Sequence, residues 1–97
     1  MPRQLTQAAD AYFAGDYEGA ISILSAARFR SAGARAHLHL LRAASRYALF
    51  LLGGEKDYAL RAEAIADVQA CRGADPDLVP DEDMFSPRFR QFFAATE

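Results

Sequence analysis

Four side chains with the chemistry to bind an anionic partner recur at helical spacing in the middle of the chain. They occupy positions i, i+4, i+7 and i+11 of a segment predicted to be helical, so they share one face of that helix. The residues are Arg35, His39, Arg42 and Arg46. Because a guanidinium offers two parallel donors to a carboxylate, this face suits an acidic peptide. The alternative is an ordinary solvated face, or pairing with Asp10, Glu63 or Asp67 inside the fold.

Two aromatic residues, Tyr12 and Phe13, end the first predicted helix and are the other candidates for partner binding. We expect one ring to pack inside a helical hairpin and the other to be exposed, where it can form a wall of a peptide groove. Packing of both rings into the hairpin core is the alternative.

Other reactive or ligating side chains fit structural roles better. His37 and His39 are two residues apart on a helix and point to different faces, which argues against a metal site. Cys71 lies on an apolar stripe, which favours core packing over nucleophilic catalysis. The five acids between residues 75 and 83 lack the glycine and terminal glutamate of an EF-hand, so we expect a solvated loop. The sequence thus predicts no catalytic residue, no metal and no cofactor.

The charges of the chain are unevenly distributed. Residues 19–54 carry five arginines and no acid, whereas residues 55–83 carry nine acids against three basic residues. The net charge of −2 argues against nucleic-acid binding. One interpretation is structural only: the two regions neutralise each other within the fold or are simply solvated. The functional alternative is a basic face for an acidic partner, or complementary faces for a homo-oligomer.

Composition favours helices over strands. Alanine, the best helix former, supplies 21 of the 97 residues, and β-branched residues are few. No apolar run of about 18 residues is present, so no membrane span is expected. The lack of a signal segment favours the cytoplasm, unless the chain is a fragment of a longer protein. Abundant alanine and arginine with a single lysine are typical of GC-rich bacterial genomes.

The spacing of apolar residues and the positions of helix breakers predict one domain, 1–97, with five helices. The predicted helices cover residues 3–14, 17–30, 34–52, 58–72 and 86–96, and an acidic loop spans 73–85. Asp16 and Asp57 are candidate N-caps, and Ser86 followed by Pro87 is a strong start signal.

The last predicted helix carries a dense set of aromatic side chains. Phe85, Phe89, Phe92 and Phe93 fall within nine residues. Burying each ring is worth roughly 1.5–3 kcal/mol, so exposure of all four to water would be costly. We therefore expect residues 86–96 to dock onto the preceding helices as a capping helix.

The stretch from Ala8 to Ala27 reads AADAYFAGDYEGAISILSAA and resembles a tetratricopeptide repeat (TPR). Small residues occupy the first helix, a Gly15-Asp16-Tyr17 turn follows, and a small-large-small triplet occupies the second helix. That triplet, Ala20, Leu24 and Ala27, recurs 44 residues later as Ala64, Val68 and Cys71. The second unit is degenerate, and its period exceeds the usual 34 residues.

The resemblance implies a right-handed α-α superhelix of two antiparallel hairpins, about 3–32 and 34–76, closed by the capping helix. TPR proteins hold peptides in a groove lined by the first helix of each hairpin. The resemblance therefore implies a non-catalytic adaptor or scaffold that binds a protein or peptide. This partner would be acidic if the arginine face is used. The alternative is a structural subunit of a bacterial multiprotein complex, packing against copies of itself or a larger partner.

Overall fold

The computed structural model describes residues 2–97 and contains five α-helices. They are α1 (Arg3–Phe13), α2 (Tyr17–Ala26), α3 (Ala32–Leu52), α4 (Tyr58–Ala74) and α5 (Pro87–Ala95). No strand occurs between residues 2 and 97. The prediction of an all-α protein is confirmed.

Four of the five helices begin at a side chain that caps the first turn. In each case a carboxylate or hydroxyl oxygen accepts a hydrogen bond from the backbone N–H group three residues later, which has no partner within the helix. The capping residues are Asp16, Ser31, Asp57 and Ser86. Because Ser31 is a cap, α3 begins at Ala32, two residues earlier than predicted.

Helix α2 ends earlier than its sequence suggests. We predicted a helix to Arg30, but Ala27 has an extended backbone with ψ of 148° and α2 stops at Ala26. The Arg28 side chain folds back and donates to the carbonyl oxygens of Ser25 and Ala27. The guanidinium thus satisfies carbonyl groups that have no partner in the last turn.

Helix α4 ends later than predicted, at Ala74, because Gly73 continues the helical backbone. Asp75 precedes Pro76 and is extended, as the proline ring requires of its neighbour. Gly15 lies at φ of 83°, the left-handed conformation expected where the chain leaves α1.

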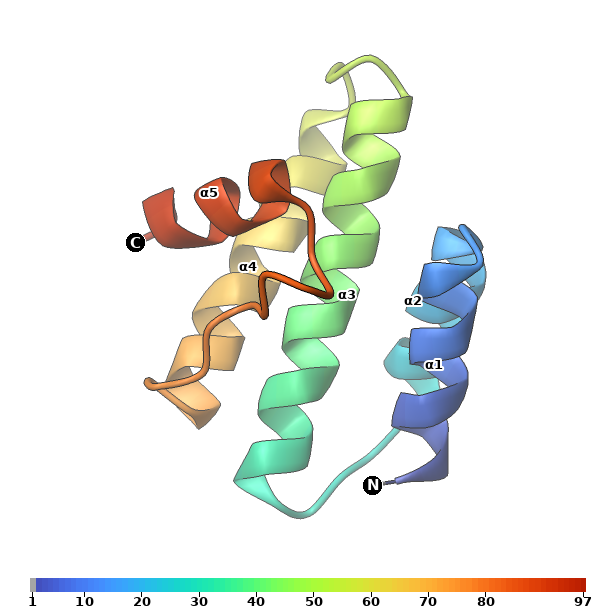
Figure 1. Cartoon of the computed structure of the whole chain (residues 1–97), viewed down its shortest axis with the longest axis vertical. Helices are drawn as coiled ribbons and strands as arrows, with labels where there is room; N and C mark the ends of the chain where they lie inside the picture. Colours follow the sequence, from blue (N-terminus) through green and yellow to red (C-terminus); the bar gives the residue numbers. More distant parts are fainter. Residues whose placement is uncertain (1) are drawn as a thin grey trace.

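Helix α3 is the centre of the arrangement (Figure 1). Helices α1 and α2 form a pair on one side of it, and α4 runs beside it on the other side. The segment between α4 and α5 crosses in front of α3 towards α1, and α5 then lies across α3 and α4. Residues from both ends of the chain therefore meet on the same face of α3.

Small side chains allow the helices to pack closely. Ala8, Ala20, Ala36, Ala43 and Ala64 are completely buried. The two small-large-small triplets, which lie 44 residues apart, are buried as well. Ala27 and Cys71 hold the third position of their triplets.

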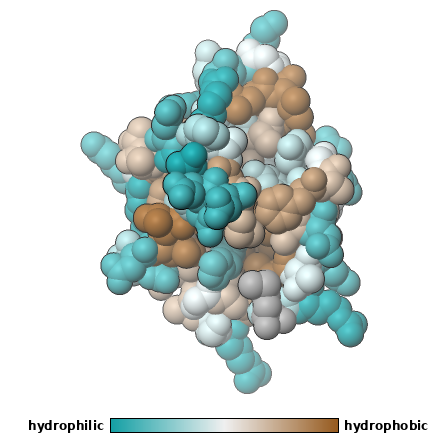
Figure 2. Space-filling model, viewed as in Figure 1, coloured by the Kyte–Doolittle hydropathy of each residue, from teal (hydrophilic) through white to brown (hydrophobic). Residues whose placement is uncertain are grey.

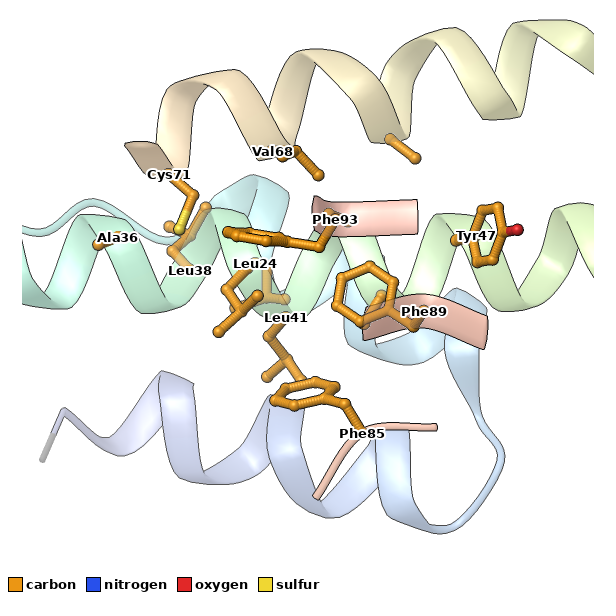
Figure 3. Packing of buried hydrophobic residues seen from close by; sticks show 14 of the residues in the cluster. Leu24, Ala36, Leu38, Leu41, Tyr47, Val68, Cys71, Phe85, Phe89 and Phe93 are labelled. Atoms are coloured by element: carbon orange, nitrogen blue, oxygen red, sulfur yellow. The ribbon is translucent and has the colours of Figure 1, made fainter. Parts of the chain in front are cut away.

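The four phenylalanines of the C-terminal segment are buried against the other helices, as expected. Figure 3 shows Phe85, Phe89 and Phe93 among the core side chains. Phe92 stacks on Tyr47 of α3 with ring centroids 4.1 Å apart, and Phe85 lies 5.8 Å from Tyr12 of α1. Arg72 of α4 donates to the carbonyl oxygens of Phe93 and Thr96 at the end of α5. This helix is therefore held by aromatic packing and by a cap from α4.

Candidate functional site

Three of the four predicted basic residues on α3 converge on one buried carboxylate. Asp67 of α4 is 3% exposed. Its Oδ1 atom lies 2.9 Å from Nη2 of Arg42 and 3.0 Å from Nδ1 of His39. Its Oδ2 atom lies 2.6 Å from Nη1 of Arg46 and 3.1 Å from Nε of Arg42. Both oxygens of the carboxylate are thus occupied by donors from α3.

Pairing inside the fold was the alternative that the sequence left open, and Asp67 and Glu63 provide it. Glu63 lies 3.2 Å from Nη2 of Arg46 at the surface. Asp10, the third acid that we considered, makes no ion pair with a residue of the described part of the chain. His39, Arg42 and Arg46 therefore join α3 to α4 as well as lining the surface.

Arg42 also reaches the other neighbour of α3. Its Nη1 atom lies 3.4 Å from the hydroxyl oxygen of Ser25 on α2. The guanidinium accordingly bridges α2 and α4, with Asp67 beneath it. The sequence did not indicate that a single acid would organise this face, because Asp10, Glu63 and Asp67 were equal candidates as partners.

Next to this cluster, the chain forms a small basic pocket between the end of α2 and the first half of α3. The pocket has a volume of about 220 Å³. Its walls are Leu24, Ala27, Arg28, Phe29, Arg35, Leu38, His39 and Arg42. We call it the α2–α3 pocket.

Arg35, the fourth predicted residue, lies at the rim of the α2–α3 pocket and is exposed. Its Nη1 atom donates to the carbonyl oxygen of Arg30 at 2.5 Å. Arg28, which sequence reasoning did not select, lies on the same rim and is also exposed. The only signal for Arg28 was its place in the acid-free stretch of residues 19–54, because we expected it inside a helix.

The two predicted aromatic residues separate as expected. Tyr12 is half-buried in a ring cluster, 5.5 Å from Tyr17 and 5.8 Å from Phe85. Burial raises the pKa of the Tyr12 hydroxyl to about 12, and the neighbouring Tyr17 adds to the rise. Phe13 remains 54% exposed and contacts Tyr12 edge to face at 5.3 Å.

A second hollow lies on the face of α3 that the C-terminal segment crosses. It has a volume of about 300 Å³ and mostly apolar walls. The walls are Leu5 and Ala9 of α1, His37, Leu40 and Leu41 of α3, and Leu78, Val79, Asp81, Met84 and Phe85 of the connecting segment. We call it the α1–α3 groove. Apolar side chains reach the surface around it in Figure 2.

The rim of the α1–α3 groove carries apolar side chains that water contacts. Val79 is 68% exposed and Met84 is 47% exposed. The sequence placed both in a solvated acidic loop and did not mark them as binding residues. Both are candidates because the loop lies against α1 and α3 and places them on the rim of the groove.

Two of the five acids of the connecting segment accept hydrogen bonds from its own backbone. The Asp75 carboxylate accepts from the N–H of Asp77 at 3.0 Å, and that of Asp81 accepts from the N–H of Asp83 at 2.7 Å. Such turns stabilise the local backbone. Among residues 2–97, no three acidic, histidine or cysteine side chains are grouped as a metal ion would require.

Cys71 packs in the core and is completely buried. Burial raises the pKa of its thiol to about 11, and the charge of Asp75 contributes to the rise. The reactive thiolate is therefore disfavoured. His37 lines the α1–α3 groove whereas His39 contacts Asp67, so the two imidazoles lie on different faces of α3.

No helix of the part described here is both long and apolar enough to cross a bilayer. No protein-family model, no curated protein and no solved structure matches the chain.

Proposed function

We propose that this chain is a non-catalytic protein-interaction module, whose α1–α3 groove takes the apolar side of a peptide or of a partner helix. The observation that carries the proposal is the open apolar groove with two strongly exposed side chains, Val79 and Met84, on its rim. Exposed apolar surface around a depression, surrounded by polar residues, is a common mark of a binding site.

The construction of the groove supports binding of an apolar segment. Its floor comes from Leu40 and Leu41 of α3, and its two sides come from α1 and from the segment after α4. Leu40 and Leu41 belong to the buried core, so the floor is rigid. Amphipathic helices and extended peptides bind in grooves of this kind through a few apolar anchors.

The proposed architecture is a TPR-like pair of right-handed helical hairpins with α5 as the cap. The burial of both small-large-small triplets supports the repeat. The groove also lies between α1 and α3, the first helices of the two hairpins, as the resemblance implies. In this arrangement the chain's own Phe85 covers Tyr12, and the partner binds beside that contact.

The groove can be tested without knowledge of the natural partner. A random displayed peptide library is selected against the full chain, and the affinity of the best peptide is measured by fluorescence anisotropy. Val79→Asp combined with Met84→Asp should weaken binding about a hundredfold or more, because two apolar contacts of about 1.5 kcal/mol or more each are lost.

Leu52→Asp provides a matched control, because Leu52 is 74% exposed and lies outside the groove. This variant should bind the selected peptide as the unchanged chain does. Equal losses in the control and in the groove variant would refute the groove as the site, as would full affinity in the groove variant.

One observation favours a second candidate, an assembly subunit that binds copies of itself. Arg28, Arg30 and Arg35 make no ion pair within the described residues, and neither do the five acids between residues 75 and 83. Both charged regions are thus available for an electrostatic contact between copies. Sedimentation velocity at several protein concentrations should show association at low salt that disappears at high salt. A monomer under all these conditions would contradict this candidate.

A further inference from the structure

The α2–α3 pocket collects more positive charge than the fold neutralises. Three guanidinium groups line it, from Arg28, Arg35 and Arg42. Asp67 is the carboxylate in contact with this set, and Glu63 pairs with Arg46 farther along α3. The three arginines and Asp67, counted without His39, leave the pocket an excess of about two positive charges.

The basic groups of the pocket are held in place by contacts on their inner sides. Arg42 is fixed by Asp67, which is buried beneath it. Arg28 and Arg35 are each anchored through Nη1 to backbone carbonyl oxygens around the end of α2. Their Nε and Nη2 groups have no hydrogen-bond partner among residues 2–97 and remain free to donate. Such preorganisation lowers the entropy lost when a ligand binds.

His39 is oriented in the same way. Its Nδ1 atom lies 3.0 Å from Oδ1 of Asp67, and the ring also lines the pocket. Its Nε2 atom makes no hydrogen bond to a described residue. A carboxylate that bonds one ring nitrogen sets the orientation of the imidazole and leaves the other nitrogen for a ligand.

We propose that the α2–α3 pocket binds the phosphate group of a phosphorylated side chain of a partner protein. A phosphomonoester carries about −1.5 to −2 charges at neutral pH and three acceptor oxygens, which matches the excess charge and the free donors of Arg28 and Arg35. A carboxylate brings only one charge and two oxygens. The volume of about 220 Å³ accommodates a phosphate group with little of its carrier.

The proposal concerns a different face of α3 from the α1–α3 groove, so it does not depend on the proposed function. Arg42 and Asp67 also hold α3 to α4, which makes them unsuitable for a test. Arg28 and Arg35 are exposed and can be changed without disturbing the core.

The experiment is an isothermal titration of the full chain with four ligands at low salt. Three are blocked peptides that differ only in carrying phosphoserine, glutamate or serine, and the fourth is inorganic phosphate. We expect the phosphoserine peptide to bind at least about tenfold more tightly than the glutamate peptide, since charge-assisted hydrogen bonds are lost in the latter. The serine peptide should not bind.

Two double variants assign the site. Arg28→Gln/Arg35→Gln should weaken phosphoserine binding about tenfold or more, and the control Arg3→Gln/Arg88→Gln, which removes two exposed arginines elsewhere, should not. Both variants should keep the helical circular dichroism of the unchanged chain.

Equal affinity for the phosphoserine and glutamate peptides would overturn the phosphate assignment. Inorganic phosphate that binds as tightly as the peptide would overturn the protein side chain as its source. Equal losses in the two double variants, or no binding by any ligand, would overturn the site.

Discussion

Asp67 is the residue on which the charged face depends most. Its carboxylate is buried and receives hydrogen bonds from Arg42 and Arg46, and it lies against the His39 imidazole. Asp67→Ala leaves these basic groups close together and partly buried without their counter-charge. We expect a loss of about 3–5 kcal/mol in the free energy of unfolding, measured by urea denaturation.

Glu63→Ala is the matched comparison. Glu63 contacts Arg46 on the same helix pair, but its side chain is 52% exposed, so its removal should cost less than about 1 kcal/mol. Similar losses in both variants would mean that Asp67 is not the organising charge of this face.

Two weakly acidic groups, the buried Cys71 thiol and the half-buried Tyr12 phenol, predict a loss of stability at alkaline pH. The folded chain raises the pKa of Cys71 from 9.0 to about 11 and that of Tyr12 from 10.0 to about 12. The unfolded chain therefore releases these protons first. The stabilisation is complete below pH 9 and is lost as pH rises through the folded values, by about 1.4 kcal/mol for each unit of pKa shift that is titrated.

Urea midpoints between pH 8 and 11 measure this effect. The midpoint should fall less steeply above pH 9 in Cys71→Ala than in the unchanged chain. Tyr12→Phe should reduce the fall only above pH 10, where the tyrosine of the unfolded chain begins to ionise. Identical pH profiles of all three proteins would contradict the shifts.

The helices themselves were predictable to different degrees. The starts of α2, α4 and α5 follow from Asp16, Asp57 and Ser86, because a cap is a local interaction within one turn. The end of α2 was not predictable. The residues after Ala26 favour a helix by composition, but the chain turns there to bring α3 against α2, and Arg28 bonds to the carbonyl oxygens that this leaves free.

Helix α5 is short, and its position depends on its phenylalanines. Phe89 is 2% exposed and lies near Phe85 and Tyr47. Phe89→Ala should cost about 3–5 kcal/mol in stability, because the change leaves a cavity between α5 and α3. Hydrogen exchange of the α5 amides should accelerate in this variant.

Gln91→Ala serves as the control for Phe89→Ala, because Gln91 is exposed on the same helix and alanine is a better helix former. It should leave both stability and exchange nearly unchanged. Rapid exchange of α5 in the unchanged chain would contradict docking of this helix.

Cooperative folding of the whole chain depends on the packing of residues 75–97 against α1 and α3. A chain that ends after Ala74 would expose the face of Tyr47 that stacks on Phe92, together with the core beside Tyr12. We expect this shortened chain to bind the dye ANS and to lose its sharp thermal transition, as proteins do when apolar core becomes accessible.

Fluorescence titration with ANS and a calorimetric scan test this expectation. A shortened chain that unfolds as cooperatively as the full chain, without dye binding, would show that residues 75–97 are not part of the core.

The amino-acid sequence by itself determined the five helices and one set of residues that share a helix face. Helix periodicity, caps and glycine breaks act over a few residues, so the five helices and the burial of the phenylalanines could be inferred. The common face of Arg35, His39, Arg42 and Arg46 also follows from the geometry of one helix.

Only the tertiary structure decided what that face contacts. Asp67 is the counter-charge of the arginines, and Arg28 lines the α2–α3 pocket. Val79 and Met84, which the sequence placed in a solvated loop, line the α1–α3 groove. Each of these contacts joins segments that are distant in sequence. Such contacts depend on how the helices pack against one another, and the local spacing of residues along one helix carries no information about it.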